Sequence, residues 1–450
     1  MDVVAAIVRE LTVFAAVGIL VGGIDDLIVD LIWAGRTVWR RLTVYRRFAR
    51  ADATTLRADG GLTIAVFVPA WREAEVIGPM LRAALARWGE GNYRIFVGCY
   101  PNDPATVAEV EAIGSDRVRL AINPRPGGTT KGDNLNSLWR AMLADEAATG
   151  NRYAGIALHD CEDVVHPAEI GIYQALLARF DLVQLPVLPL IETSCGLWRR
   201  VISSVAADEF SEAHQKTLVV REAVGAAVPS AGVGCCFSRV ILDRVAARQG
   251  VPFDTFSLTE DYELGLRIAE LGGRGIFVRL PAAGGQAAVA VREHFPETFA
   301  AAVTQKARWQ AGIALSGWHR LGWRGGLAER WMRLRDRRSI VAALVLSCGY
   351  GSALAVLILS AAGTSIRFAA WEVSLFAWCT GLMLWRMLVR ALFVARDYGW
   401  AEGLASAPRL LIGNAIAIAA ARRALFTYAR ERRGRGVSWD KTEHRFPELG

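Results

Sequence analysis

Acidic residues gather at three places in this sequence, and each place has groups that suit a chemical step. Residues 100–104 read Tyr-Pro-Asn-Asp-Pro, residues 159–163 read His-Asp-Cys-Glu-Asp, and residues 257–261 read Ser-Leu-Thr-Glu-Asp. Carboxylates that have no cations of their own suit a hard divalent metal ion, and Mg²⁺ is typically shared with the phosphates of a substrate. The second cluster therefore suggests a divalent cation site, and Asp261 is able to act as a general base at the edge of a pocket.

The first two clusters also have structural interpretations. The tripeptide at 102–104 is typical of a turn. The acids at 160–163 suit the first turn of a helix, where negative charge is favourable. We expect His159 and His166 to form hydrogen bonds rather than to bind a metal.

The third cluster has the pattern of a helix start. Ser257 and Glu260 have the spacing of a capping box. A helix over 262–271 would follow, and Gly272 would stop it. A capped helix therefore explains these residues without any chemistry.

Two further stretches offer groups that bind phosphate or sugar. Residues 127–133 read Gly-Gly-Thr-Thr-Lys-Gly-Asp, a glycine-rich turn that opens a helix and presents N–H groups and a lysine to a phosphate. Gln305, Arg308 and Trp309 form the last cluster, in which Arg suits a diphosphate and Trp suits the face of a sugar. Taken alone, the first stretch is a weak motif and the second is typical of an ordinary amphipathic helix.

Alternating strand and helix patterns must position these clusters. The sequence predicts strands at 64–68, 94–100, 118–122 and 155–158, and helices at 74–87, 106–113 and 131–147. This order is typical of an α/β fold with a mainly parallel sheet that helices cover on both faces. Ligands bind beyond the carboxyl ends of such strands, so the clusters would converge on one crevice. The absence of a GxGxxG after the first strand and of a GxxxxGK[ST] loop disfavours a dehydrogenase and a P-loop NTPase.

Charge and hydropathy indicate a membrane protein. The 450 residues are 53% hydrophobic with a net charge of +8. Three blocks carry most of the positive charge: 36–57 (+6), 330–338 (+4) and 422–435 (+5). These blocks flank the most apolar stretches, which is the positive-inside pattern, whereas a nucleic-acid binder would more often spread such charge over a groove. The seven cysteines include no CxxC pair, which disfavours a zinc module.

The apolar stretches predict membrane spans at both ends of a soluble region. One span is expected within 3–34, where Asp25, Asp26 and Asp30 would face an interface or other helices. Two more are expected at about 339–363 and 368–385. The stretch at about 409–421 is short and has basic residues on both sides, so we expect an interfacial or re-entrant helix there.

These expectations divide the chain into four parts. They are an N-terminal transmembrane helix (1–35), a basic juxtamembrane segment (36–60), the α/β domain (61–330) and a C-terminal membrane region with a basic tail (331–450). The charge pattern places the α/β domain and the tail in the cytosol of a bacterial cell, with the helices in the inner membrane.

Taken together, the clusters resemble a known order of motifs. Processive family 2 glycosyltransferases, such as cellulose and hyaluronan synthases, carry D, DxD, TED and QxxRW followed by membrane helices. The same order is found here in Asp103, Asp160-Cys161-Glu162, Thr259-Glu260-Asp261 and Gln305-x-x-Arg308-Trp309. Glu162 replaces the second Asp of DxD, and a carboxylate remains.

The similarity to the NfrB-type membrane glycosyltransferases is closer and covers nearly the whole chain. Besides the acidic clusters it is carried by Val-Pro-Ala-Trp at 68–71, Gln-Leu-Pro-Val at 184–187, Pro-Ser-Ala-Gly-Val-Gly at 229–234 and Trp-Asp-Lys-Thr at 439–442. The cyclic di-GMP-associated regulatory domain of longer members of this family is not expected within the chain.

The resemblance implies a glycosyltransferase A-type domain that binds a nucleoside diphosphate sugar, with a UDP-sugar as the expected donor. It implies that Glu73 and Asp103 hold the base and ribose end. It also implies that Asp160 and Glu162 hold Mg²⁺ or Mn²⁺ on the diphosphate.

The same resemblance implies roles on the acceptor side. Asp261 would deprotonate the acceptor hydroxyl as it attacks the anomeric carbon with inversion. Lys131 and Arg308 would offset the charge of the leaving group, and Trp309 would stack on the acceptor. Two more substrate-binding residues complete the implied set, Glu260 and Gln305.

Two classes of function follow. The first is a membrane-bound inverting glycosyltransferase that extends a surface or secreted polysaccharide, with transfer to a polyprenyl phosphate as a variant. The second is a membrane interaction or export component, similar to phage-adsorption proteins, with weak or no transferase activity. The expected partners are the donor, a glycan or lipid-linked acceptor, membrane lipids and an outer-membrane or periplasmic export partner, but no nucleic acid. The presence of all the carboxylates and of the QxxRW residues favours the first class.

Overall fold

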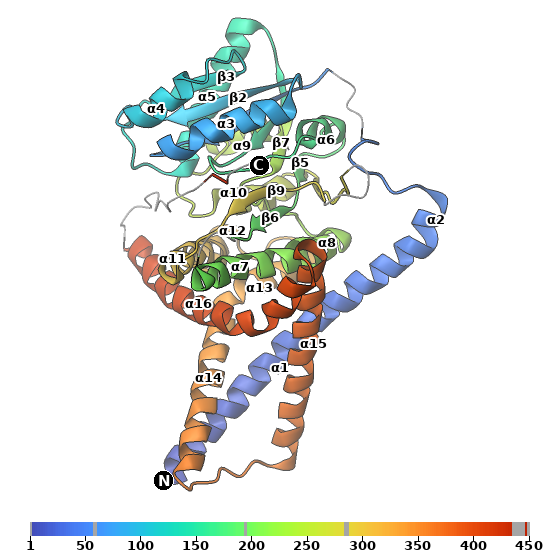
Figure 1. Cartoon of the computed structure of the whole chain (residues 1–450), viewed down its shortest axis with the longest axis vertical. Coiled ribbons are helices and arrows are strands. Elements are labelled where there is room, and N and C mark those ends of the chain that lie inside the picture. The colour runs from blue at the N-terminus through green and yellow to red at the C-terminus, as the bar shows by residue number, and fades with distance from the viewer. Residues whose placement is uncertain (1, 57–60, 193–195, 283–287, 434–445, 448–450) are drawn as a thin grey trace.

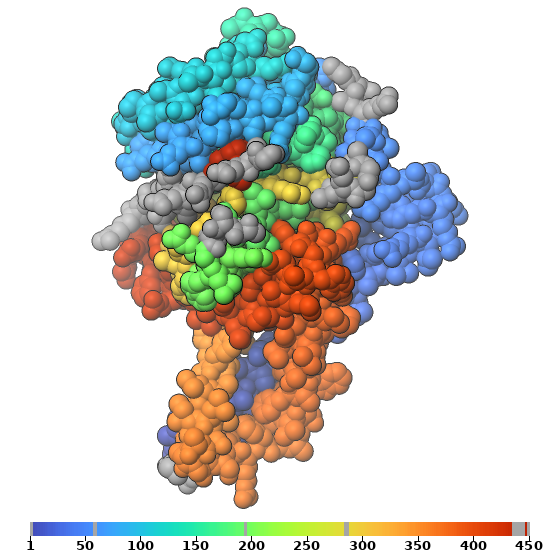
Figure 2. All heavy atoms as spheres, in the orientation of Figure 1, coloured from blue at the N-terminus to red at the C-terminus, as the bar shows by residue number. Residues whose placement is uncertain are grey.

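The computed structural model describes residues 2–56, 61–192, 196–282, 288–433 and 446–447. An α/β unit lies above three long helices that project from it, α1 (Asp2–Trp39), α14 (Ser339–Ala361) and α15 (Ala370–Tyr398) (Figure 1). A fourth long helix, α16 (Trp400–Arg432), lies between this bundle and the α/β unit. Figure 2 shows the same division into a broad upper body and a narrower stalk of helices.

In the described part of the chain, the central sheet has seven strands in the order β3-β2-β1-β4-β7-β5-β8. Among them β7 runs antiparallel to β4 and β5, and the other paired strands run parallel. The predicted α/β fold with a mainly parallel sheet is confirmed. The strands are β1 (Thr63–Pro69), β2 (Tyr93–Cys99), β3 (Val118–Ile122), β4 (Tyr153–Leu158), β5 (Leu182–Gln184), β7 (Cys235–Ser238) and β8 (Gly275–Phe277).

Helices cover both faces of this sheet, because alternate side chains of each strand point to opposite sides. On β1, Val66 and Val68 belong to one buried core and Ala65 and Phe67 to the other. Two covered faces explain why the strands are apolar throughout. The first core includes residues of α3 (Ala74–Trp88), α4 (Pro104–Glu111) and α6 (Glu169–Leu176), and the second includes residues of α5 (Lys131–Thr149), α9 (Arg239–Gln249) and α10 (Glu260–Glu270).

A layer of shorter elements lies between this sheet and the long helices (Figure 1). It includes a two-stranded parallel sheet of β6 (Val187–Leu190) and β9 (Val291–His294). Its helices are α7 (Leu197–Glu212), α8 (Leu218–Ala223), α11 (Phe299–Trp309), α12 (Gly317–Leu321) and α13 (Leu327–Arg337), with π-helical turns η2 (Ala213–Thr217) and η4 (Gln310–Ser316). At the other end of the chain, η1 (Arg40–Val44) and α2 (Tyr45–Arg47) continue α1.

Among the residues that the structure describes, four helical stretches are long and apolar enough to cross a membrane: 3–47, α14, α15 and α16. The protein is therefore membrane-associated. Glycines let α1 approach its neighbours closely. A Cβ atom added at Gly18 would lie 2.5 Å from Val345 of α14, and one at Gly23 would lie 3.0 Å from Leu382 of α15. Small residues at such crossings are typical of packed membrane helices.

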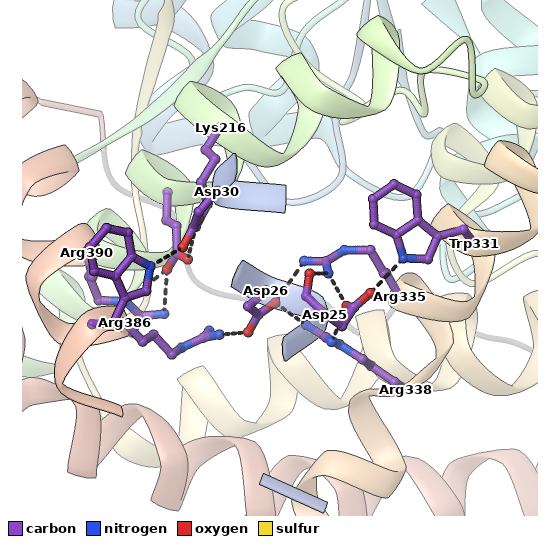
Figure 3. A network of polar contacts seen from close by, with 11 residues as sticks. Asp25, Asp26, Asp30, Lys216, Trp331, Arg335, Arg338, Arg386 and Arg390 are labelled. Atoms are coloured by element: carbon purple, nitrogen blue, oxygen red, sulfur yellow. Dashed lines mark hydrogen bonds and ion pairs between the residues drawn. The ribbon is translucent and has the colours of Figure 1, made fainter. Parts of the chain in front are cut away.

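Acidic residues of α1 form ion pairs with basic residues more than 300 positions later (Figure 3). Asp25 and Asp26 both pair with Arg335 and Arg338, and Asp26 also pairs with Arg386 of α15. This arrangement confirms the expectation that these acids face other helices. The 22 residues from Val3 to Ile24 span about 33 Å as a helix, close to the hydrocarbon thickness of a bilayer. The network therefore lies where α1 would leave the membrane.

The third acid of α1 is paired in the same region. Asp30 Oδ1 lies 2.6 Å from Lys216 Nζ, and Asp30 Oδ2 accepts a hydrogen bond from Trp385 Nε1 at 2.8 Å. Lys216 also pairs with Glu212, which in turn pairs with Arg390 of α15. Residues of α1, η2, α7 and α15 thus neutralise one another, which offsets the cost of placing charges beside apolar helices.

Helix α16 extends well beyond the expected 409–421. It has the length to cross a membrane, but in Figure 1 it lies across the upper ends of α14 and α15 and packs against α7 and α11. Its buried Arg409 pairs with Asp208 of α7 at 2.7 Å and with Glu402 at 2.5 Å. Because α7 belongs to the α/β unit, these pairs favour an interfacial α16, which stays our prediction.

Candidate functional site

A pocket of about 660 Å³ opens beyond the carboxyl ends of β1 and β4. Because the loops that follow parallel strands meet at this edge of a sheet, the sequence clusters converge there. Of the ten residues expected to bind substrate or metal or to act in catalysis, nine line the pocket, and Asp103 is the exception. The nine are Glu73, Lys131, Asp160, Glu162, Glu260, Asp261, Gln305, Arg308 and Trp309.

Asp103 shapes the pocket from behind. Its Oδ2 accepts a hydrogen bond from the backbone N–H of Arg72 at 2.6 Å. Arg72 has φ +57°, a left-handed conformation that non-glycine residues rarely adopt. The backbone N–H of Glu73 donates to Thr106 Oγ1 at 2.9 Å. Asp103 and Thr106 of α4 therefore hold the turn that places Glu73 in the pocket.

The glycine-rich loop places Lys131 at the start of α5. The Thr130 hydroxyl caps this helix by accepting from the Asp133 N–H at 3.2 Å. Gly127 packs against the ring of Trp71, and a Cβ atom there would lie 2.0 Å from the ring. This close approach explains the glycine, because any side chain would displace Trp71.

Lys131 is the cation at the centre of the acidic cluster. Its Nζ lies 2.5 Å from Asp160 Oδ1. Burial alone would lower the pKa of Lys131, but the charges of Asp160, Glu260 and Asp261 raise it above its ordinary value. Lys131 therefore stays charged at neutral pH and links the loop after β4 to the start of α10.

His159 has a structural position, as expected. It is fully buried, with Nδ1 2.7 Å from Asp163 Oδ2 and Nε2 3.2 Å from Glu169 Oε2. Burial alone would lower the pKa of His159, but these two carboxylates raise it to about 10. Asp163 Oδ2 also accepts from the backbone N–H of Asp160 at 3.1 Å. His159 thus orients the loop that carries Asp160 and Glu162.

The donor set fits a hard divalent cation. Asp160, Glu162 and Glu293 line the same pocket, and burial together with the charges of Asp163, Glu162 and Asp160 raises the pKa of Glu293 well above its ordinary value. A bound cation would relieve this excess of negative charge. Within the described ranges no three His, Cys, Asp or Glu residues form a metal-binding group by themselves, so remaining ligands would come from substrate or water.

Helix α10 starts at Glu260, and the predicted capping box is wrong. Its N-cap residue is Thr259. Ser257 instead donates its hydroxyl to Glu263 Oε1 at 2.6 Å and accepts from the Thr259 N–H at 3.2 Å. The Ser257 hydroxyl is thus engaged by the buried Glu263 and does not accept from the Glu260 N–H, as a capping box would require. The predicted stop is confirmed, because the helix ends before Gly272, which has φ +77°.

Asp261 is held from two sides. Its Oδ1 accepts from the backbone N–H of Tyr262 at 2.7 Å. Its Oδ2 faces Gly232, which has φ +80° and whose added Cβ atom would lie 2.2 Å away. Burial raises the pKa of Asp261, while Lys131 and Arg308 oppose that rise. The carboxylate is thus more basic than an exposed one, and it faces the pocket.

The wall of the pocket that α11 forms combines a cation with aromatic rings. In the described part of the chain, Arg308 makes neither a hydrogen bond nor an ion pair, although it lines the pocket. Trp309 lies beside Phe210 and Phe295, with ring centroids 6.1 Å and 6.3 Å away. A guanidinium beside apolar ring faces suits an anionic leaving group and a sugar ring.

Sequence reasoning missed several residues of this wall. Glu293 lies in the short strand β9, and Phe295 directly follows that strand. Phe210 comes from α7, Arg221 from α8 and Asp336 from α13. None of them belongs to a motif of the sequence. A signal for Glu293 and Phe295 existed only in their spacing, which places a carboxylate and a ring on one side of an extended segment.

Comparisons with known proteins agree with this geometry. Residues 61–312 match the family model described as glycosyltransferase like family 2. The whole chain is 37% identical to bacteriophage adsorption protein B of Escherichia coli K12 and to bacteriophage N4 adsorption protein B of Escherichia coli O157:H7. It spans 64% of the length of these two relatives.

A solved structure has the same architecture. The mannosyltransferase PcManGT from Pyrobaculum calidifontis, in complex with GDP-Man and Mn²⁺, matches 94% of this chain and 99% of its own. The TM-score is 0.55 at 16% identity. At that identity the likeness concerns the fold alone.

Proposed function

This chain belongs to glycosyltransferase family 2, and from that membership we propose that it is a membrane-bound inverting glycosyltransferase. It would move a sugar from a nucleoside diphosphate sugar to a growing surface or secreted polysaccharide. The observation that carries the proposal is the pocket in which nine residues of the family pattern meet. The GDP-Man and Mn²⁺ held by PcManGT support a nucleotide donor and a divalent cation.

The donor side is assigned to the loops after β1, β2 and β4. Glu73 would hold the base and ribose end, and Asp103 would act through the Arg72 turn that it stabilises. Asp160 and Glu162, with Glu293 beside them, would hold Mg²⁺ or Mn²⁺. A divalent cation would supply positive charge to the diphosphate.

The chemical step is assigned to Asp261. Its carboxylate would take the proton of the acceptor hydroxyl while the hydroxyl oxygen attacks the anomeric carbon. The bond from that carbon to the diphosphate breaks on the opposite side, so the configuration inverts. Lys131 and Arg308 would offset the charge that develops on the departing diphosphate. The rings of Trp309 and Phe295 would bind the acceptor sugar.

A second function is favoured by one observation, the names of the two relatives, which concern phage adsorption. Under it the protein would be an export or interaction component with weak or no transferase activity. A variant of the first function has a polyprenyl phosphate as the acceptor. This variant is supported by the pocket's lining, which includes residues from the layer of helices beside the long membrane helices.

A donor screen separates these functions. Purified protein with Mg²⁺ or Mn²⁺ should release UDP or GDP from one of a panel of nucleotide sugars, and a UDP-sugar is the expected donor. Glycan and polyprenyl phosphate acceptors are then compared for incorporation of labelled sugar. No nucleotide release from any donor, by protein that binds none of them, would favour the interaction component.

The location of the pocket can be tested in cells. Basic residues near the ends of the apolar helices favour a protein of the bacterial inner membrane. Its α/β unit and its C-terminal tail would then lie in the cytosol. A reporter fused after Gly450 should therefore be active in the cytoplasm and inactive in the periplasm. Periplasmic activity would mean that α16 crosses the membrane and that an interfacial α16 is wrong.

A further inference from the structure

Helix α13 contacts both the pocket and the membrane helix α1, and Asp336 makes its contact with the pocket. Tyr262 of α10 donates its hydroxyl to Asp336 Oδ2 at 2.6 Å. Arg221 of α8 donates its Nη1 to both oxygens of Asp336, at 2.9 Å and 2.8 Å. Tyr262 and Arg221 are buried, and all three residues line the pocket. One carboxylate from α13 therefore ties together α10 and α8.

The same helix also holds the far end of α10. Arg333 Nη2 lies 3.2 Å from Glu270, the last residue of α10, and Arg333 Nε lies 2.7 Å from Glu329. Glu329 in turn accepts from the backbone N–H of Ala227 at 2.8 Å. Since Tyr262 is near the first turn of α10, α13 fixes that helix at both ends.

The opposite side of α13 is attached to the membrane helices. Arg335 and Arg338 pair with Asp25 and Asp26 of α1 (Figure 3), and Trp331 Nε1 donates to Asp25 at 2.6 Å. Consecutive helical residues point about 100° apart. Arg335 and Asp336 both line the pocket, but their charged groups have different partners. Arg335 pairs with Asp25 and Asp26 of α1, whereas Asp336 bonds to Tyr262 and Arg221.

From these contacts we infer that Asp336 is a positioning residue for the proposed reaction. Through its bond to Tyr262, Asp336 holds Asp261 in place. The inference rests on the proposed function of the pocket. Tyr262 directly follows Asp261, and its backbone N–H donates to Asp261 Oδ1. Loss of the Tyr262–Asp336 bond frees the first turn of α10, so Asp261 leaves the position opposite Gly232. Donor-binding loops after β1 and β4 are untouched by this change.

Tyr262→Phe tests the inference, because it removes one hydroxyl and keeps the Arg221–Asp336 pair. Its turnover number for sugar transfer should fall about tenfold while donor affinity stays unchanged. Asp336→Asn should lower transfer at least as much, and the double variant should add little, because both act on one bond. Amide hydrogen exchange over 257–266 should rise in each variant.

Tyr398→Phe is the matched control. Its hydroxyl donates to the Pro189 carbonyl at 2.6 Å, and Tyr398 does not line the pocket. It loses an equivalent bond and should keep both transfer and exchange over 257–266.

The outcomes separate the inference from the proposed function. If the wild-type protein transfers sugar and Tyr262→Phe transfers at the same rate, the inference is wrong and the function stands. An equal fall in donor affinity and turnover would also overturn it, since that pattern indicates general loosening. If the wild-type protein turns over no donor, the function fails, and unchanged exchange in Tyr262→Phe then overturns the inference as well.

Discussion

Asp261→Asn should bind the donor like the wild-type protein and transfer sugar about 10²–10⁴-fold more slowly. The amide has the shape of the carboxylate, so the Tyr262 N–H keeps an acceptor and the fit against Gly232 is preserved. It cannot take a proton from the acceptor hydroxyl. Donor affinity and the rate of labelled-sugar transfer, measured side by side, test this expectation.

Glu260→Gln is the control beside it. Burial and the charge of Asp261 raise the pKa of Glu260 to about 7. The raised pKa favours the protonated form of Glu260, which the amide resembles. We expect a smaller loss of transfer than in Asp261→Asn. If Asp261→Asn transfers sugar at the wild-type rate, the assignment of Asp261 as the general base is wrong. Asp261 would then be only a residue of the helix start.

Removal of the divalent cation should abolish donor turnover, and so should Asp160→Asn. Asp160, Glu162 and Glu293 line one pocket in which Lys131 is the nearest cation. A diphosphate brought to this cluster without a divalent cation would meet uncompensated carboxylates. The measurements are nucleotide release in the presence of EDTA and binding of Mn²⁺ to each protein by spin resonance.

Two variants distinguish the loss of the metal site from the loss of the Lys131–Asp160 ion pair. Asp243→Asn makes the same chemical change at the Arg239–Asp243 pair, outside the pocket, and should keep full turnover. Lys131→Met breaks the bond to Asp160 but leaves the carboxylates, so it should still bind Mn²⁺. Full turnover in excess EDTA, or unchanged Mn²⁺ binding by Asp160→Asn, would remove the metal from the proposed function.

The long elements of the α/β unit were predictable from the sequence. The predicted strand at 64–68 is β1 at Thr63–Pro69, and the predicted helix at 131–147 is α5 at Lys131–Thr149. Both have residue patterns that persist over several residues, and burial on one or both faces enforces such patterns. Strands β5 and β8 have only three residues each, too few to show a period. The antiparallel position of β7 depends on partners far along the chain.

The candidate site was predictable in its residue types but not in its contacts. Motif order identified Asp160, Asp261 and Arg308, because carboxylates and a guanidinium at these spacings suit one kind of chemistry. The spacing of Ser257 and Glu260 predicted a capping box, but the Ser257 hydroxyl donates to the buried Glu263 instead. Local spacing cannot choose between partners that burial places side by side.

The sequence by itself determined which stretches are apolar, where the basic blocks flank them, and which carboxylates follow the strands. Tertiary structure alone decided that Asp26 pairs with Arg386 and that Asp336 meets Tyr262. It also decided that Asp103 stays behind the pocket, holding the Arg72 turn. Ionic and hydrogen-bond energies depend on distance in space, and residues hundreds of positions apart acquire that distance only when the helices pack.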